Sequence, residues 1–151
     1  MKKRQVKLDD LMPVFREQLE QNGKVAFTPA GTSMRPMLDH RKDEVYLVKV
    51  DKNSVKKWDV VLYQTEQGAY VMHRVIKLDS NGFITRGDNI YYNDAVQTYD
   101  RLIGKVFQFI HKGKQHSVTD FSYQCYTVFW VVSYWPRKIV RGVLRRILRR
   151  K

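Results

Sequence analysis

The chain has 151 residues, of which 28 are Lys or Arg and 15 are Asp or Glu, giving a formal charge of +13. This length fits one domain, and the 43% apolar and 13% aromatic shares suffice for a packed core, which excludes a wholly disordered chain. The single cysteine, Cys125, and four scattered histidines exclude an internal disulfide framework and a multi-thiolate metal site. We therefore expect no structural metal.

Residues 8–22 predict one amphipathic helix, because Leu8, Leu11, Phe15 and Leu19 recur at helical spacing and Gly23 follows. The basic start of the chain resembles the first part of an export signal. The residues that follow contain no apolar run of the necessary ~7–15 residues, however, so we do not assign one. We assign residues 1–24 to the domain as its N-terminal helix.

Short runs rich in Val, Ile, Tyr and Phe then alternate with turn residues. These runs predict strands over residues 25–28, 44–50, 59–64, 69–77, 82–85 and 102–111. Strands do not alternate with long helices, which argues against a parallel sheet. The sequence therefore predicts a mainly β fold, with an antiparallel β domain over residues 25–120.

Residues 121–151 differ from the body in composition. Aromatic side chains such as Tyr126 and Trp130 precede residues 137–151, which hold eight cations, no anion and an apolar stripe at helical spacing. No stretch reaches the ~20 apolar residues of a spanning helix. We expect a basic amphipathic helix and a membrane-associating segment, residues 126–151, that binds an anionic surface peripherally on the cytoplasmic face. Packing on the domain's own core, or docking to nucleic acid or a partner helix, is the alternative; nothing else in the chain indicates a nucleic-acid partner.

The segment Gly31-Thr-Ser-Met-Arg-Pro36 contains a candidate nucleophile, Ser33. A serine hydroxyl needs an adjacent base and backbone N–H groups directed at the oxyanion. A tight loop between Gly31 and Pro36 would suit such exposure, although Gly and Ser are also common in ordinary turns.

A candidate base, His73, lies on a predicted strand whose period-2 alternation places it with Ala69, Val71 and Val75. It is either a neutral imidazole that can accept a proton or a histidine packed in the core. Asp88, in Gly87-Asp-Asn89, and Asp94 offer carboxylates to orient it, while the same residues are typical of turns.

Taken together, these motifs resemble the ordered boxes of type I signal peptidases and their LexA-like relatives. The resemblance covers about residues 26–106. The boxes are Gly31-x-Ser-Met-x-Pro36, Asp59-Val-Val61, His73-Arg-Val75, Gly87-Asp-Asn89 and Ile103-Gly-Lys-Val106. The base position holds His73 where bacterial enzymes and LexA-like repressors have Lys, as in the endoplasmic-reticulum and archaeal branch.

This resemblance implies a signal-peptidase-like β fold and a serine endopeptidase that cleaves leader or signal-type peptides. Ser33 would be the nucleophile and His73 the general base, with Asp94 as the acid of the triad and Asp88 as support or alternative acid. The Ser33 N–H would help to form the oxyanion hole, Met34 would line the pocket unless it is core, and Gly31 offers no hydroxyl to assist.

Two features depart from the family pattern. A charged amphipathic helix stands where a membrane-spanning helix usually precedes the serine, and Trp58-Asp59 replaces the usual Gly-Asp. The basic C-terminal segment could replace the anchor. A catalytically silent peptide-binding adaptor and a LexA-like self-cleaving regulator remain alternatives, although no helix-turn-helix pattern precedes Gly23.

Overall fold

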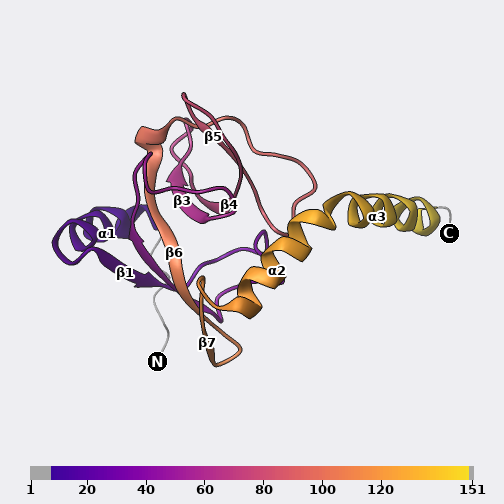
Figure 1. Ribbon diagram of the computed structural model, residues 1–151, viewed down its shortest axis with the longest axis horizontal. Coiled ribbons are helices and arrows are strands. Elements are labelled where there is room, and N and C mark those ends of the chain that lie inside the picture. The colour runs from indigo at the N-terminus through magenta and orange to yellow at the C-terminus, as the bar shows by residue number, and fades with distance from the viewer. Residues whose placement is uncertain (1–7, 150–151) are drawn as a thin grey trace.

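The protein combines one N-terminal helix, an antiparallel sheet and two C-terminal helices (Figure 1), in a computed structural model that describes residues 8–149. The elements in chain order are α1 (Leu8–Asn22), β1 (Lys24–Phe27), β2 (Glu44–Lys49), β3 (Val60–Gln64), β4 (Tyr70–Leu78), β5 (Phe83–Arg86), the short 3-10 turn η1 (Tyr99–Arg101), β6 (Leu102–His111), β7 (Lys114–Ser117), α2 (Phe121–Val132) and α3 (Tyr134–Leu148). Residues 1–7 of the predicted N-terminal segment and 150–151 of the predicted C-terminal segment lie outside the described residues.

The fold class is mixed α/β, which corrects the expectation of a mainly β protein. The predicted helix 8–22 and the predicted strand 102–111 are confirmed at both ends, and the other five predicted strands are confirmed to within two residues. The sequence analysis missed β7, whose Lys-Gln-His-Ser sequence carries no apolar alternation. It also treated residues 121–136 as part of a tail, whereas they form the whole of α2 and the start of α3.

All strand pairings in the sheet are antiparallel, in the order β1-β2-β6-β3-β4-β5. The long strand β6 organises it: β2 pairs along one of its edges, while β3 and then β7 share the other. Since β3 pairs with both β6 and β4, strand β4 is separated from the long strand β6 by β3 alone.

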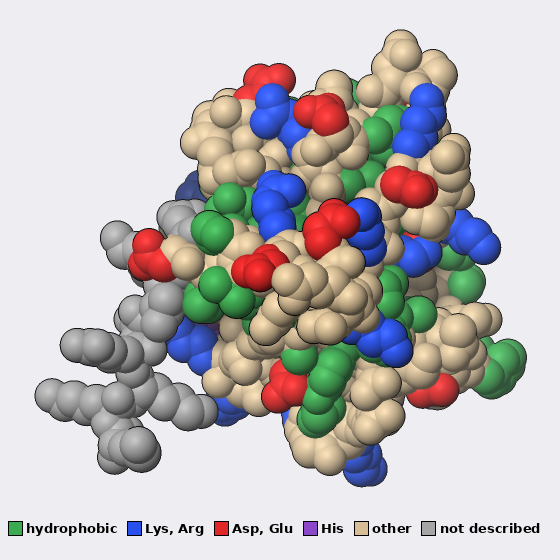
Figure 2. Space-filling model, turned by 90° about the vertical axis from the view of Figure 1, so that its left-hand side faces the viewer, with side chains coloured by type: hydrophobic (Ala, Val, Ile, Leu, Met, Phe, Trp, Pro, Cys, Tyr) green, Lys and Arg blue, Asp and Glu red, His purple; other side chains and the backbone are tan. Residues whose placement is uncertain are grey.

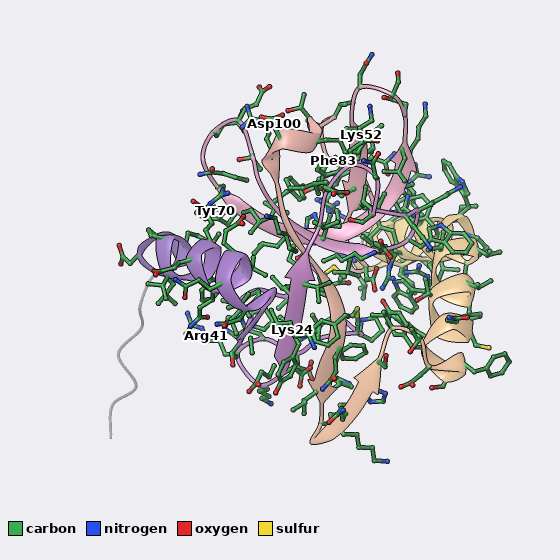
Figure 3. All side chains as sticks on the ribbon, turned by 60° about the vertical axis from the view of Figure 1, so that its left-hand side comes forward. Lys24, Arg41, Lys52, Tyr70, Phe83 and Asp100 are labelled. Carbon is green, nitrogen blue, oxygen red and sulfur yellow. The ribbon has the colours of Figure 1, made fainter. Side chains whose placement is uncertain are left out.

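Two apolar clusters lie on the two faces of the sheet. The larger one joins Phe15 and Leu19 of α1 to Leu62 of β3 and Tyr123 of α2, and the smaller one includes Val61 and Phe83. Alternate residues of β3 face opposite clusters, as strand geometry requires. Each fully buried aliphatic or aromatic side chain contributes about 1.5–3 kcal/mol to folding. Phe83 lies among the strands at the end of the molecule remote from β7 (Figure 3).

The two C-terminal helices relate differently to this body. Tyr123 and Thr127 of α2 are buried, so this helix packs on the domain. In contrast, α3 extends away from the body, and its C-terminal end is remote from the sheet (Figure 1). Over residues 8–149, no helix combines the length and apolar character needed to cross a membrane.

Candidate active site

Strand β4 presents two chemically different side chains to opposite faces of the sheet. His73 is paired in register with Val61 of β3, on the face of the smaller apolar cluster. The next residue, Arg74, points to the other face, where it contacts Met37 and Tyr123. The period-2 placement of His73 with Val71 and Val75 is therefore confirmed, and both of these valines belong to or pack against that cluster.

His73 is hydrogen-bonded to Asp94. Its Nδ1 lies 2.6 Å from the Asp94 Oδ2 atom, and the two side chains are only 12% and 18% exposed. The same Oδ2 accepts hydrogen bonds from Thr85 Oγ1 at 2.7 Å and from the Tyr63 hydroxyl at 3.3 Å. Burial alone raises the pKa of Asp94, but the hydrogen bonds from His73, Thr85 and Tyr63 outweigh it and hold that pKa below its ordinary value.

The tautomer of the neutral imidazole follows from this contact. At neutral pH the Asp94 carboxylate is ionised and can only accept hydrogen bonds, so the Nδ1 atom of His73 must carry the proton. In the neutral ring the other nitrogen, Nε2, then has its lone pair free to accept a proton. Burial raises the pKa of the Tyr63 hydroxyl, which keeps this group protonated as a donor near Asp94.

Ser33 lies in the loop between β1 and β2, and its neighbours anchor that loop in the core. Met34, Met37 and Leu38 belong to the larger apolar cluster, each less than 5% exposed. Met34 is thus a core residue in this structure, one of the two positions expected for it. The Ser33 side chain is half-buried.

Gly31 begins the turn before Ser33 with a φ of +107°, and a Cβ added there would meet no atom within 4 Å. The Gly31 N–H donates to the Nδ1 atom of His40 at 2.6 Å. His40 therefore helps to hold the loop that carries Ser33.

Gly87 brings the Ser33 loop and His73 together. A Cβ added at this position would lie 2.7 Å from the Ser33 carbonyl oxygen, closer than real Cβ atoms come, and 3.0 Å from His73 Nε2, tighter than most real Cβ contacts. Only a residue without a side chain permits this approach. Both groups are therefore neighbours of the same backbone point, and Nε2 faces the side of the site on which Ser33 lies.

Asn89, in the loop that follows β5, also holds the loop that carries Ser33. Its N–H donates to the Ser33 carbonyl oxygen at 2.8 Å, and its side-chain amide donates to the Thr32 carbonyl oxygen at 3.3 Å. Among the described residues there is no hydrogen bond between the Ser33 hydroxyl and His73; the structure places the serine backbone beside the imidazole, and the hydroxyl is not yet engaged.

Asp88 binds Arg74, not His73, for which the sequence analysis had kept it as an alternative acid. Its two carboxylate oxygens accept hydrogen bonds from Arg74 Nε and Nη2, both at 2.7 Å, and Oδ2 also accepts one from the Tyr126 hydroxyl at 2.8 Å. Of the two candidate aspartates it is Asp94 that contacts the imidazole. Asp88 faces the opposite side of the sheet, where the Arg74–Asp88 pair is almost completely buried.

This buried pair ties α2 to the site loop. Arg74 also donates to the Tyr123 hydroxyl at 3.1 Å, while the Trp130 indole N–H donates to the Asp88 carbonyl oxygen at 2.8 Å. Burial alone lowers the pKa of Arg74, but the adjacent Asp88 carboxylate raises it overall, so the guanidinium stays charged. Burial and the Asp88 charge also raise the pKa of Tyr126.

Trp58, which stands where the resemblance described above predicts Gly, has a backbone conformation that is unusual for a non-glycine residue. Its φ is +76°, in the left-handed region that favours glycine, and its N–H donates to the Val75 carbonyl oxygen at 2.8 Å. The turn into β3 therefore keeps the backbone shape that Gly would adopt easily, with Trp in its place. Holding a non-glycine residue there costs roughly 1–2 kcal/mol.

A second histidine–aspartate pair lies outside this site. His111 Nδ1 is 2.5 Å from Asp43 Oδ2, and the donor atoms of Asp39, Asp43 and His111 all lie within 4.8 Å of one another, as a metal site would require. The Asp43 carboxylate, however, already accepts hydrogen bonds from His111 and from the backbone N–H groups of Asp39 and Lys112. These bonds account for the cluster as a tie between the β6–β7 turn and the loop before β2.

The sequence analysis missed the residues that position the triad candidates rather than forming them. Tyr63 and Thr85 orient Asp94, and Asn89 and Tyr126 hold the loop between β5 and β6. Thr85 is register partner of Val75, two residues from His73, so a correct strand pairing would have identified it. The Tyr126 contact depends on the packing of α2, for which the sequence holds no local signal.

Comparison with known proteins adds no assignment: no protein-family model matches the chain, and no curated protein matches it significantly.

Proposed function

We propose that this protein is a serine endopeptidase of the signal-peptidase/LexA-like type, in which Ser33 is the nucleophile, His73 the general base and Asp94 the orienting acid. The observation that carries the proposal is the environment of one imidazole. Its Nδ1 is hydrogen-bonded to an ionised carboxylate. Its Nε2 lies 3.0 Å from the point that a Cβ would occupy if one were added to Gly87, beside the Ser33 loop. A serine, a histidine and an aspartate in this relation are the parts of a proton-transfer triad.

In the proposed reaction, Nε2 of His73 accepts the proton of the Ser33 hydroxyl as Oγ attacks a peptide carbonyl. The Asp94 carboxylate stabilises the imidazolium that forms. The His73 ring then donates the proton to the leaving amine, and water hydrolyses the acyl-enzyme by the same route. Catalytic hydrogen bonds are often long before substrate binds, so a rotation of the Ser33 side chain toward Nε2 is the step the substrate must complete.

The Ser33 N–H supports this chemistry, because within residues 8–149 it donates to no other group and remains available to an oxyanion. The proposed substrates are leader or signal-type peptides with small residues before the cleaved bond, bound as an extended strand against a sheet edge. That substrate class follows from the resemblance of the motif boxes, and the reaction needs no metal or organic cofactor.

The test is cleavage of a leader-peptide library, followed by mass spectrometry. We expect defined products with the wild type and a loss of at least about 10³-fold with Ser33→Ala or His73→Ala. Ser80→Ala, an exposed serine on the β4–β5 turn, is the matched control and should cleave normally. Products that persist in Ser33→Ala at the wild-type rate would refute the proposal.

The unengaged Ser33 hydroxyl favours one alternative, a peptide-binding adaptor that has lost turnover. Such an adaptor would bind a leader peptide tightly and release no product, whether or not Ser33 is present. A LexA-like regulator would instead cleave its own chain, which the intact mass of purified protein over several hours would reveal.

A further inference from the structure

A continuous apolar surface runs along α2 and α3 on the outside of the molecule. We call it the apolar ridge; its members are all at least 46% exposed. They are Phe121, Val128, Phe129, Val132, Trp135, Ile139, Val140, Val143, Leu144, Ile147 and Leu148. A soluble protein rarely exposes so many large apolar side chains side by side, and such patches mark binding surfaces.

The orientation of α2 is fixed by its inner face, so the ridge cannot simply turn inward. Tyr123 and Tyr126 contact Arg74 and Asp88, and Trp130 binds the Asp88 backbone, with all three on one side of the helix. Rotating α2 to bury Phe129 would break these bonds and expose the buried Arg74–Asp88 pair. The exposure of the α2 part of the ridge is therefore built into the fold.

The orientation of α3 is set in the same way. The Tyr134 hydroxyl donates to the Tyr91 carbonyl oxygen at 2.8 Å, and the guanidinium of Arg137 lies 3.6 Å from the centre of the Trp130 ring. One turn further on, Arg141 lies 4.7 Å from the centre of the Tyr91 ring. These contacts to the body all come from one side of α3, the side that carries its cations.

The apolar residues of α3 occupy the other side. They form two rows at four-residue spacing, one from Trp135 to Ile147 and one from Val140 to Leu148, while Arg137, Arg141, Arg145 and Arg149 form a row at the edge. One side of the helix is thus mostly apolar, with Arg146 among its apolar residues, and the other side is basic. This is the pattern of a helix that lies in the plane of a membrane interface.

The charged residues of the segment that carries the ridge have a single sign. The sequence contains no Asp or Glu after Asp120, whereas residues 137–151 contain eight Lys and Arg. The opposite side of the molecule, near α1, mixes acidic and basic side chains with only small separated apolar patches (Figure 2). The α2–α3 surface, unlike the face near α1, therefore combines a large apolar area with unbalanced positive charge.

We propose that the apolar ridge of α2 and α3 docks this protein on an anionic lipid surface. Apolar side chains enter the interface while the flanking cations contact lipid phosphates. A second copy of the chain would cover the apolar rows but would bring two strongly basic helices together without an anion between them. Nucleic acid would engage the cations but leave the apolar rows in water. Anionic lipid satisfies both halves of α3 at once.

Docking in this way also constrains the site. Trp130 and Tyr126 hold Asp88, and its neighbour Asn89 holds Ser33, so α2 connects the lipid surface to the candidate nucleophile through three successive contacts. This step depends on the proposed peptidase function: if that holds, the substrates are peptides tethered to, or emerging at, the same lipid surface.

The test is vesicle flotation of the full chain. Wild-type protein should bind vesicles of phosphatidylglycerol and phosphatidylcholine in equal parts and should not bind phosphatidylcholine alone. Arg145→Gln/Arg146→Gln should weaken binding by about 25-fold, since each cation near the surface contributes about fivefold. Lys56→Gln/Lys57→Gln, an equal charge loss on an exposed turn elsewhere, is the matched control and should bind nearly as the wild type.

The apolar part of the ridge is tested by Ile139→Glu/Ile147→Glu, which should abolish flotation at concentrations where the wild type binds fully. Val96→Glu changes a similarly exposed residue away from the ridge and should have little effect. All these sites are exposed, and a circular dichroism melt checks that each variant folds. Ser33→Ala should bind vesicles like the wild type, so loss of catalysis and loss of docking are distinguishable.

The proposal is overturned if the wild-type protein fails to float with anionic vesicles, or if Ile139→Glu/Ile147→Glu floats as well as the wild type. It is also overturned if the wild type sediments as a dimer that this double variant dissociates, while vesicles remain unbound. Salt-dependent binding to DNA that survives the double variant, without flotation, would likewise assign the surface to nucleic acid.

Discussion

Substituting Gly87 tests the contact on which the candidate site depends. In Gly87→Ala the new methyl group would lie 2.7 Å from the Ser33 carbonyl oxygen, 2.8 Å from the Ile90 side chain and 3.0 Å from His73 Nε2. Because Gly87 does not have a left-handed φ, its backbone tolerates Ala, and any loss arises from these contacts alone. Ordinary contacts begin near 3.4 Å, so the Ser33 loop and the imidazole must move apart by several tenths of an ångström.

Two magnitudes follow from this displacement. Overpacking a close junction costs about 1–3 kcal/mol of the free energy of unfolding. Moving two reacting groups apart by a fraction of an ångström to 1 Å lowers catalysis by about 10–100-fold, since 1 Å can cost ~10²-fold. We therefore expect Gly87→Ala to remain folded at low temperature, to unfold at lower urea concentration, and to cleave leader peptides at least about tenfold more slowly.

The assays are urea unfolding followed by circular dichroism and initial rates of peptide cleavage by mass spectrometry. Gly142→Ala is the control, because a Cβ there meets no atom within 4 Å and Ala favours the helix. It should leave cleavage unchanged and should not lower stability. If Gly87→Ala cleaves and unfolds like the wild type, the Ser33 loop and His73 do not depend on this contact, and our reasoning about the site is wrong.

Three further substitutions test the carboxylates and the attachment of α2. Asp94→Asn should lower cleavage by about 10²–10⁴-fold, because the imidazole loses its orienting anion. The pKa of Asp94 is held below its ordinary value of 3.8, so its charge stabilises the fold above that pH and this contribution is lost as the pH falls through the lower folded pKa. In urea unfolding from pH 7 to 2, the stability of the wild type should therefore begin to approach that of Asp94→Asn below about pH 4 and should meet it only below the folded pKa. Asp88→Asn leaves Arg74 buried without its anion and should cost about 3–5 kcal/mol, whereas Arg74→Met/Asp88→Leu should regain much of it; equal stability of all three would contradict a buried pair. Tyr126→Phe should cost about 1.5–3 kcal/mol by removing a bond to a charged group, while Tyr92→Phe, on an exposed tyrosine, should unfold like the wild type.

The helix α1, the strand β6 and the face of β4 that carries His73 could be predicted from the local pattern of apolar residues. The helical spacing of Phe15 and Leu19 and the stop at Gly23 predicted α1 to the residue, and the β-branched run of β6 did the same for the central strand. The face of β4 that carries His73 also followed from period 2. These features could be predicted because neighbours in sequence already fix their periodicity and burial.

Contacts between distant segments could not be predicted in this way. The resemblance named Asp94 as the acid and Asp88 as the alternative, but the sequence could not decide which one contacts the imidazole, because both lie in turns a few residues apart. The decision depends on the face to which each one points after β5, and Arg74, one residue from His73, attracts Asp88 to the other side of the sheet. In the same way, the aromatic residues of segment 121–136 suggested a tail, but three of the seven bind the buried pair and Tyr134 is also buried. Phe121, Phe129 and Trp135 face solvent.

The sequence alone thus determined which residue types are candidates for the site, the order in which they occur along the chain and the amphipathic pattern of α3. Tertiary structure decided which carboxylate meets the imidazole, that Gly87 is the point where serine and histidine approach, and that α2 is tied to the site. The physical reason is that these properties arise from the pairing of strands and the burial of charge between segments far apart in the chain. Such pairing energies are absent from any single stretch of sequence.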